Sequence, residues 1–137
     1  MIDLDRFVKA QEPILATIRQ ELREGRKRSH WMWFVFPQLA GLGHSATAVH
    51  YAIPSLADAR AYLRHPLLGP RLVECTGLVN RVEGRSAHDI FGSPDDRKFH
   101  SCVTLFALAQ PDKPVFREAL DRYFGGALDM GTTERLG

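Results

Sequence analysis

The sequence is short of cysteine, of long apolar runs and of net charge, and each shortage excludes a class of protein. It contains two cysteines, Cys75 and Cys102, which lie in apolar helical stretches without CxxC spacing. We therefore expect buried thiols in a reducing, cytoplasmic location, rather than a disulfide or a metal site. The longest apolar run covers residues 31–36 and is far too short to span a membrane. The first residues also lack the charged segment and apolar core of a signal peptide.

The charge balance is equally ordinary. The net charge is +2, and the one compact basic run, residues 26–28, is offset by Glu21 and Glu24 just upstream. Because no extended basic face or binding motif accompanies this run, the sequence argues against a nucleic-acid partner. Residues 1–137 fit one domain with a single core, and 45% hydrophobic and 25% charged residues are typical of a globular chain. We expect no membrane contact, and the oligomeric state stays open.

The familiar motifs of metal and cofactor sites are missing as well. The six histidines fall in different predicted elements, and neither HExxH nor a paired His/Cys spacing occurs. The sequence also lacks GxSxG, a Walker loop and GxGxxG. We therefore predict a protein with no metal and no other cofactor.

What the sequence does contain is helical apolar spacing, interrupted by capping residues and prolines. Ser55, with Asp58 three residues later, predicts a helix that begins at the next residue. Ser93, followed by a proline and two aspartates, predicts another helix start with Ser93 as the cap. Pro37 and Pro66 mark breaks between elements. The predicted fold class is all-α: a compact, single-domain, helical bundle-like fold with six to eight helices and at most a minor strand.

Residues 30–43, with the sequence HWMWFVFPQLAGLG, are the most unusual stretch of the chain. Its aromatic run suits either a buried strand or a buried helical turn, and any minor strand of the fold is expected there. We expect Trp31 and Trp33 to be largely buried. His30 and Gln38 flank the run, and their polar groups need partners wherever they lie. The segment therefore predicts part of the core beside a polar pocket.

Charged side chains that suit a binding site follow in two further places. Asp95, Asp96 and Lys98 stand at the predicted helix start, where the aspartates act as base or ligand contact or else serve the helix dipole. Lys98 is then either an anion contact or a solvated side chain. Arg71, after a proline corner, either grips a phosphate or carboxylate or pairs with Glu74. The local sequence leaves these alternatives open.

Five of these strings, taken together, resemble one protein family. They are SHWMWFVFPQLAGLG at 29–43, YAI at 51–53, AYLRHPLLGPRL at 61–72, IFGSPDDRK at 90–98 and TLF at 104–106. The set is similar to the bacterial domain of unknown function 1810, whose members are often mislabelled calpastatin-like. The resemblance implies a mainly α-helical single domain without an established activity, cofactor or catalytic set. It adds Tyr51, His65 and Ser101 to the motif positions, while the chain departs from the family pattern at Cys102 and Val103.

We expect a polar and aromatic cleft that binds an anionic or nucleotide-like small molecule, with or without catalysis. Its ligand-binding residues are expected to be His30, Trp31, Gln38, Tyr51, His65, Arg71, Lys98 and Ser101. In an enzyme, Asp95 or Asp96 would be the general base and His30 would move a proton. The alternative is a non-catalytic protein-interaction or regulatory module. Both hypotheses require His30, Gln38, Arg71, Asp95 and Lys98 to meet on one concave surface, whereas a purely structural motif set does not.

Overall fold

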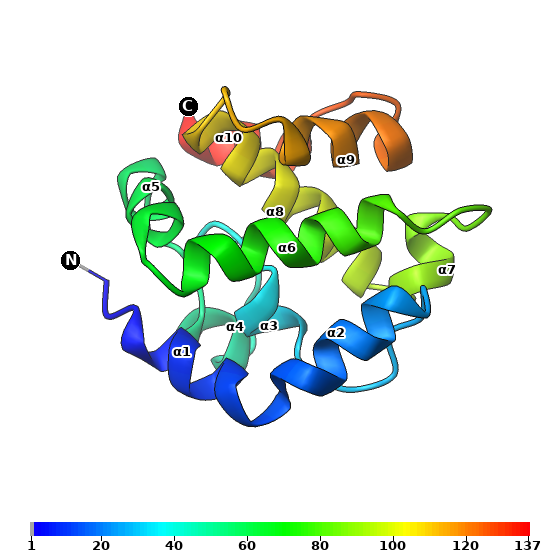
Figure 1. Ribbon diagram of the computed structural model, residues 1–137. Helices are drawn as coiled ribbons and strands as arrows, with labels where there is room; N and C mark the ends of the chain where they lie inside the picture. Colours follow the sequence, from blue (N-terminus) through cyan, green and yellow to red (C-terminus); the bar gives the residue numbers. More distant parts are fainter. Residues whose placement is uncertain (1) are drawn as a thin grey trace.

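The fold is all-α, as predicted. The structure is a computed structural model that describes residues 2–137, and within that range it contains ten α-helices and one 3-10 helix (Figure 1). The helices are α1 (Asp5–Gln11), the 3-10 helix η1 (Glu12–Ile14), α2 (Leu15–Arg23), α3 (Met32–Val35), α4 (Ala46–His50), α5 (Leu56–Arg64), α6 (Leu68–Asn80), α7 (Ala87–Phe91), α8 (Asp95–Ala109), α9 (Pro114–Phe124) and α10 (Met130–Leu136). The only β-pairing in residues 2–137 is an isolated bridge between Leu39 and Ile53.

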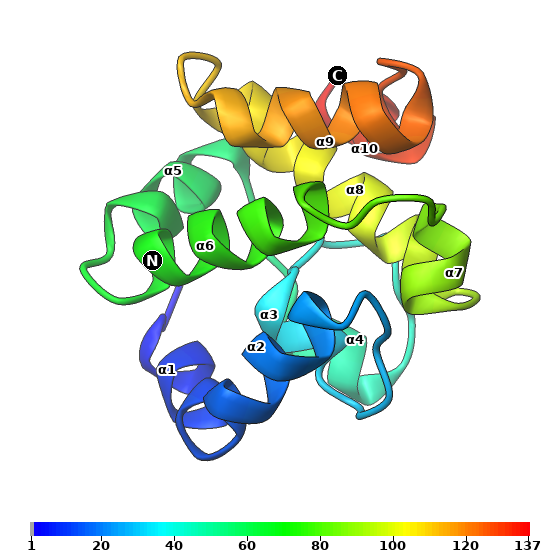
Figure 2. The same ribbon diagram turned by 45° about the vertical axis from the view of Figure 1, so that its right-hand side comes forward.

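Helix α8 is the central element. It contacts α5, α7, α9 and α10, and every side chain from Ser101 to Ala107 is buried. A helix that is buried on all sides belongs to the core rather than to the surface. In Figure 1, α8 crosses behind α6, and the view in Figure 2 shows α9 above both. The beginning of α8 emerges from the core beside α7, and this places its first turn at the surface.

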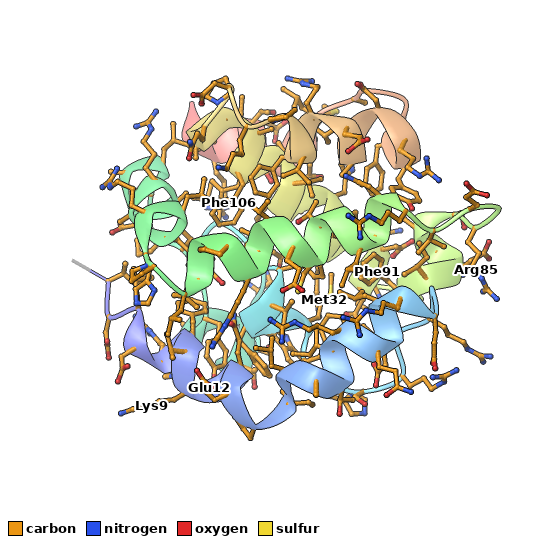
Figure 3. All side chains as sticks on the ribbon, in the orientation of Figure 1. Lys9, Glu12, Met32, Arg85, Phe91 and Phe106 are labelled. Carbon is orange, nitrogen blue, oxygen red and sulfur yellow. The ribbon has the colours of Figure 1, made fainter. Side chains whose placement is uncertain are left out.

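Helix α6 joins the remaining elements to this centre. It packs against α5, α2 and α9, so it links the N-terminal and C-terminal parts of the chain. The spaces between the ribbons are filled by apolar side chains, among which Met32, Phe91 and Phe106 are labelled in Figure 3 and are all buried. The core therefore runs continuously from the aromatic segment at α3 to α8 and α9.

Several local predictions are confirmed. Ser55 accepts a hydrogen bond from the backbone amide of Asp58 at 3.1 Å and caps α5. α3 ends before Pro37, and Pro66 lies between α5 and α6. Burial raises the pKa of the Cys75 thiol to about 12 and the pKa of Cys102 well above its ordinary value, so both thiols are protonated at neutral pH.

Two local predictions are wrong, and one alternative that the sequence left open is decided. The helix count was too low because α3, α4 and α7 are single turns of four or five residues. Of the two alternatives for the aromatic run, the structure has the helical turn, Met32–Val35. Ser93 does not cap α8, because the backbone amides of Asp96 and Arg97 donate to the carbonyls of Gly92 and Pro94.

Among residues 2–137, none of the helices has the length and apolar character that a membrane crossing requires.

Candidate functional site

Two lysines share one aspartate where the loop after α2 meets the beginning of α8. Asp95 is the first residue of α8, and its Oδ2 atom lies 2.9 Å from Lys27 Nζ. Its Oδ1 atom lies 3.2 Å from Lys98 Nζ, at the i, i+3 spacing that brings two helical side chains together. The exposed fraction is 8% for the Lys27 side chain, 18% for Asp95 and 20% for Lys98. Solvent therefore reaches this cluster mainly at Asp95 and Lys98.

Each lysine also lies over the face of a tryptophan. Nζ of Lys27 is 5.2 Å from the ring centroid of Trp31, and Nζ of Lys98 is 4.8 Å from the ring centroid of Trp33. At these distances an ammonium group is attracted to the π-face of an indole. Trp31 is fully buried, as predicted, whereas Trp33 is only partly buried. We call Lys27, Trp31, Trp33, Asp95 and Lys98 the tryptophan–lysine site.

A buried glutamate on α2 fixes the loop that carries Lys27. The Glu21 carboxylate accepts hydrogen bonds from the backbone amides of Arg28 (2.8 Å) and Ser29 (3.0 Å). It also accepts from the Ser29 hydroxyl (2.6 Å) and the Trp31 indole N–H (3.0 Å). Burial alone would raise the pKa of Glu21, but these hydrogen bonds outweigh it and lower the pKa to about 2. One ionised group therefore holds both the loop and Trp31.

Within the tryptophan–lysine site, two ammonium groups face one carboxylate, so one positive charge is not neutralised by the residues of the site. In the first turn of α8, the backbone amides of Asp96, Arg97 and Lys98 already donate to backbone carbonyls. An anionic group that enters the site would therefore be held by lysine side chains. The chemistry that this arrangement offers is charge-assisted hydrogen bonding to an anion beside an indole ring.

The other two catalytic candidates lie elsewhere on this surface. Asp96 Oδ2 is 3.4 Å from Nδ1 of His88, and its Oδ1 accepts the backbone amide of Arg97 at 2.9 Å. His30 is exposed in the loop before α3. Of the three residues expected to carry catalysis, only Asp95 belongs to the tryptophan–lysine site, and both of its oxygens are engaged by lysines.

Arg71 belongs to a separate cluster. Its guanidinium donates to Glu12 Oε1 at 2.7 Å and reaches Gln11 Oε1 at 3.4 Å. Glu74, the alternative partner expected from the sequence, instead binds Arg19 through both carboxylate oxygens. Arg71 is therefore neutralised within the fold, by a residue that the sequence did not single out.

The Arg71 cluster and the tryptophan–lysine site lie at opposite ends of α2. The partners of Arg71 precede α2, whereas Lys27 follows it. The nine residues of α2 give a helix roughly 14 Å long. None of the hydrogen bonds or ion pairs of Arg71 within residues 2–137 involves Asp95 or Lys98, and the expectation of one concave surface for all five residues stays a prediction.

Two further expected ligand-binding residues stabilise helix ends. Nδ1 of His65 accepts the backbone amides of Leu67 (3.1 Å) and Leu68 (3.2 Å) where α6 begins. Ser101 is buried, and its hydroxyl is 2.9 Å from Oδ2 of Asp129, the residue that caps α10. Both contacts are made within the fold, so these side chains are already partnered.

Gln38 and Tyr51 lie in the segment that returns from α3 toward α4. The backbone carbonyl of Gln38 accepts the amide of Ile53 at 2.8 Å, and its side chain is partly exposed. The Tyr51 ring packs against Phe7 and Phe34, with a centroid distance of 5.5 Å in each case. These contacts tie the glycine-containing loop to α1 and α3.

Sequence reasoning missed Lys27 of the site and Glu21, which holds the loop that carries Lys27. Lys27 was interpreted as part of a short basic run, and Glu21 as a charge that offsets this run. The partner of Lys27 is Asp95, which lies far away in the sequence, so no local pattern could reveal the pair. The only available signal was the aromatic segment itself, because its indole N–H groups needed acceptors.

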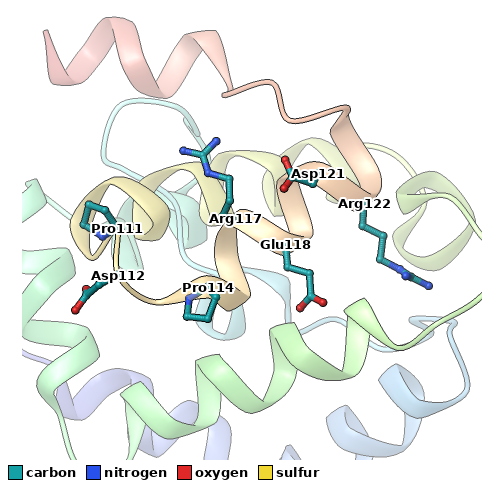
Figure 4. A pocket seen from close by; sticks show the side chains of 7 residues that line it. All are labelled: Pro111, Asp112, Pro114, Arg117, Glu118, Asp121 and Arg122. Atoms are coloured by element: carbon teal, nitrogen blue, oxygen red, sulfur yellow. The ribbon is translucent and has the colours of Figure 1, made fainter.

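Two other features of the molecule bear on where a ligand could bind: an open hollow and the placement of metal-ligating side chains. A hollow of about 910 Å³ lies along α9 and is open to solvent (Figure 4). Its lining residues are Pro111, Asp112, Pro114, Arg117, Glu118, Asp121 and Arg122. Because their charges are of both signs, the hollow favours neither an anion nor a cation. Residues 2–137 contain no group of three or more His, Cys, Asp or Glu side chains placed to hold a metal ion.

Comparison with known proteins places this chain among uncharacterised relatives. A family model described as a protein of unknown function (DUF1810) matches residues 1–136. The crystal structure of the conserved hypothetical protein Rv1873 from Mycobacterium tuberculosis is similar, with 58% sequence identity and a TM-score of 0.96. The similarity covers 98% of this chain and 96% of that chain. No curated protein sequence matches significantly.

Proposed function

The chain belongs to the DUF1810 family of proteins of unknown function, and we propose that it binds a small anionic molecule at the tryptophan–lysine site. The observation that carries this proposal is the sharing of Asp95 by Lys27 and Lys98 at 2.9 and 3.2 Å. Shielded charges are costly unless they are paired, and here two cations have one partner. An anion at the solvent-facing side of Lys98 would complete the pairing.

The surroundings of Lys98 favour a particular class of anion. Its ammonium lies 4.8 Å from the centroid of Trp33, a ring that is partly open to solvent. A ligand held by this ammonium would therefore lie next to an aromatic surface, which suits a flat apolar group. Lysine ammonium groups act as point donors to phosphate oxygens. A phosphorylated molecule with an aromatic part, such as a nucleotide, fits both requirements.

Binding of an anion at this site requires no catalysis. Any reaction there would depend on the carboxylate of Asp95. It is the only carboxylate within ion-pairing distance of the two lysines among residues 2–137. While both lysines hold it, its oxygens are occupied. A ligand anion that takes over Lys98 would release Oδ1 of Asp95, and this oxygen would then be free to accept a proton from the ligand.

A thermal-shift experiment tests the binding proposal. We would measure the melting temperature with inorganic phosphate, pyrophosphate, AMP and ADP, for the parent protein, Lys98→Met and Lys9→Met. Lys9 is a matched control, because it forms a lysine–aspartate pair within one helix (3.1 Å to Asp5) but is 79% exposed and makes no cation–π contact within residues 2–137. A ligand at 100 times its Kd stabilises the native state by about 2.7 kcal/mol.

We expect at least one of these anions to raise the melting temperature of the parent protein and of Lys9→Met. The rise should be lost in Lys98→Met. If no anion stabilises the parent, or if Lys98→Met responds as strongly as Lys9→Met, the proposal is wrong.

A further inference from the structure

The C-terminal ends of α2, α6 and α9 lie at the same end of the molecule (Figure 1). A hollow of about 220 Å³ lies there, lined by Arg23, Leu78, Arg81 and Val82. Arg23 is the last residue of α2, and Arg81 follows the last residue of α6. We call this feature the arginine-rimmed hollow. It shares no residue with the tryptophan–lysine site.

Two more arginines stand beside Val82. The side chains of Val82 and Arg85 cover Gly25 so closely that a β-carbon there would lie 2.9 Å from Val82 and 3.4 Å from Arg85. Arg122 donates from Nη2 to the Val82 carbonyl at 2.6 Å. Arg85 is labelled at the edge of the molecule in Figure 3, and Arg122 also lines the α9 hollow of Figure 4. Four arginines from three segments, namely α2, the connection between α6 and α7, and α9, therefore gather around one residue.

These arginines have no acidic partner inside the fold. Within residues 2–137, no carboxylate forms an ion pair with Arg23, Arg81, Arg85 or Arg122. Cations near helix C-termini offset the helix dipole, and Arg122 does so through its bond to Val82. The guanidinium groups of Arg23 and Arg81 make no comparable hydrogen bond to the described chain, so their donors remain available to a partner.

The floor of the hollow is apolar, and this decides which kind of partner fits. Leu78 and Val82 form the floor, and Leu78 retains 8% exposure. An apolar centre surrounded by arginines is typical of protein interfaces, in which an apolar anchor is buried inside a polar rim. Contacts to a nucleic-acid backbone use guanidinium groups but need no apolar centre.

The geometry points to a docking site for an acidic segment of a partner protein. An apolar side chain of that segment would enter the hollow between Leu78 and Val82. Aspartate or glutamate residues on either side of it would pair with Arg23 and Arg81, which are exposed, and with the adjacent Arg85. Arginine forks bind carboxylates in a bidentate fashion, so the rim would fix the register of the segment.

Fluorescence anisotropy with a labelled peptide tests this inference. The probe is a nonapeptide with a central leucine and four glutamates on each side, compared with the same peptide carrying serine at the centre. The test variant is Arg23→Glu/Arg81→Glu, and the control is Arg64→Glu/Arg117→Glu, at two exposed arginines outside the hollow. Each arginine-to-glutamate change removes one positive charge and adds one negative charge, so both double variants have a net charge of −2 instead of +2.

We expect the leucine peptide to bind the parent protein with a Kd below about 1 mM. The affinity should fall at least about tenfold in Arg23→Glu/Arg81→Glu and at least about threefold with the serine peptide. The control variant should lose less than about threefold. Melting temperatures of the two variants are compared first, since all four substituted arginines are exposed and should tolerate the change.

Three outcomes would overturn the inference. The first is that the leucine peptide does not bind the parent. The second is that both double variants lose affinity equally, because net charge alone would then explain binding. The third is that a single-stranded oligonucleotide with eight phosphates binds more tightly than the peptide and depends on Arg23 and Arg81, which would make the hollow a nucleic-acid contact.

Discussion

Arg71 and Lys98 are both partly buried cations, yet their surroundings differ in charge balance. Arg71 has its own carboxylate, Glu12, and a second acceptor in Gln11. Lys98 shares the single carboxylate of Asp95 with Lys27. The first cluster is complete as it stands, whereas the second has room for one more negative charge. Charge balance therefore separates a structural ion pair from a candidate binding site more sharply than the type of residue does.

The largest effect is expected at the buried side of the tryptophan–lysine site. Trp31→Ala should lower the free energy of unfolding by about 3–5 kcal/mol, because Trp31 is fully buried and its indole N–H is bonded to Glu21. Trp33→Ala should cost less than half as much, because Trp33 is only partly buried. Urea unfolding of both variants measures the difference. Equal losses would show that Trp33 is as much a core residue as Trp31. The proposal that a ligand lies against a solvent-accessible Trp33 ring would then be wrong.

Glu21→Gln should have the next largest effect, about 2–3 kcal/mol at pH 7, because a charged acceptor of four hydrogen bonds is replaced by a neutral one. The hydrogen bonds lower the pKa of Glu21 from an ordinary 4.5 to about 2. Its ionised form therefore adds stability above about pH 4.5, and that stability is lost as the pH falls toward 2. Unfolding at pH 7, 4 and 3 should show the parent approaching Glu21→Gln as the pH decreases. A constant difference across this range would mean that the glutamate does not titrate as its surroundings require.

The all-α fold class and some helix ends could be predicted from the sequence, because capping and periodicity act between neighbouring residues. Ser55 with Asp58 is an example, since the cap and its amide are three residues apart. The start of α8 could not be predicted correctly, because its first amides bond to backbone carbonyls instead of to Ser93. Hydrogen bonds between backbone groups do not depend on the type of side chain, so the residue types do not reveal them.

The candidate site was predictable only in part, because its charges are paired across the fold. Asp95, Lys98 and Trp31 were identified as functional candidates, but Lys27 meets Asp95 only through the packing of the loop after α2 on α8. Arg71 was assigned to the same cleft because family motifs place all these residues in one set. Which motif residues meet is fixed by tertiary packing, and a motif set contains both structural and functional members.

Asp95→Asn tests the charge imbalance directly. It leaves Lys27, with 8% of its side chain exposed, without a charged partner, so the free energy of unfolding should fall by about 2 kcal/mol. The expected loss is below that of a fully buried pair because Lys98 can turn toward solvent. In the double variant Asp95→Asn/Lys27→Met at least half of the loss should be recovered, because no unpaired shielded lysine remains there. If the double variant is less stable than Asp95→Asn alone, Lys27 contributes packing instead of an ion pair.

The smallest effect is expected from Glu12→Gln, which removes the corresponding carboxylate of the Arg71 cluster. Glu12 is 54% exposed, and an ion pair that is open to solvent contributes little. Arg71 also keeps Gln11, whose amide is fixed by its bond to the Phe34 carbonyl at 2.7 Å. The free energy of unfolding should therefore change by less than about 1 kcal/mol, measured by urea unfolding beside Asp95→Asn. A loss as large as that of Asp95→Asn would show that the two clusters depend equally on their carboxylates, and the contrast between a complete and an incomplete ion cluster would fail.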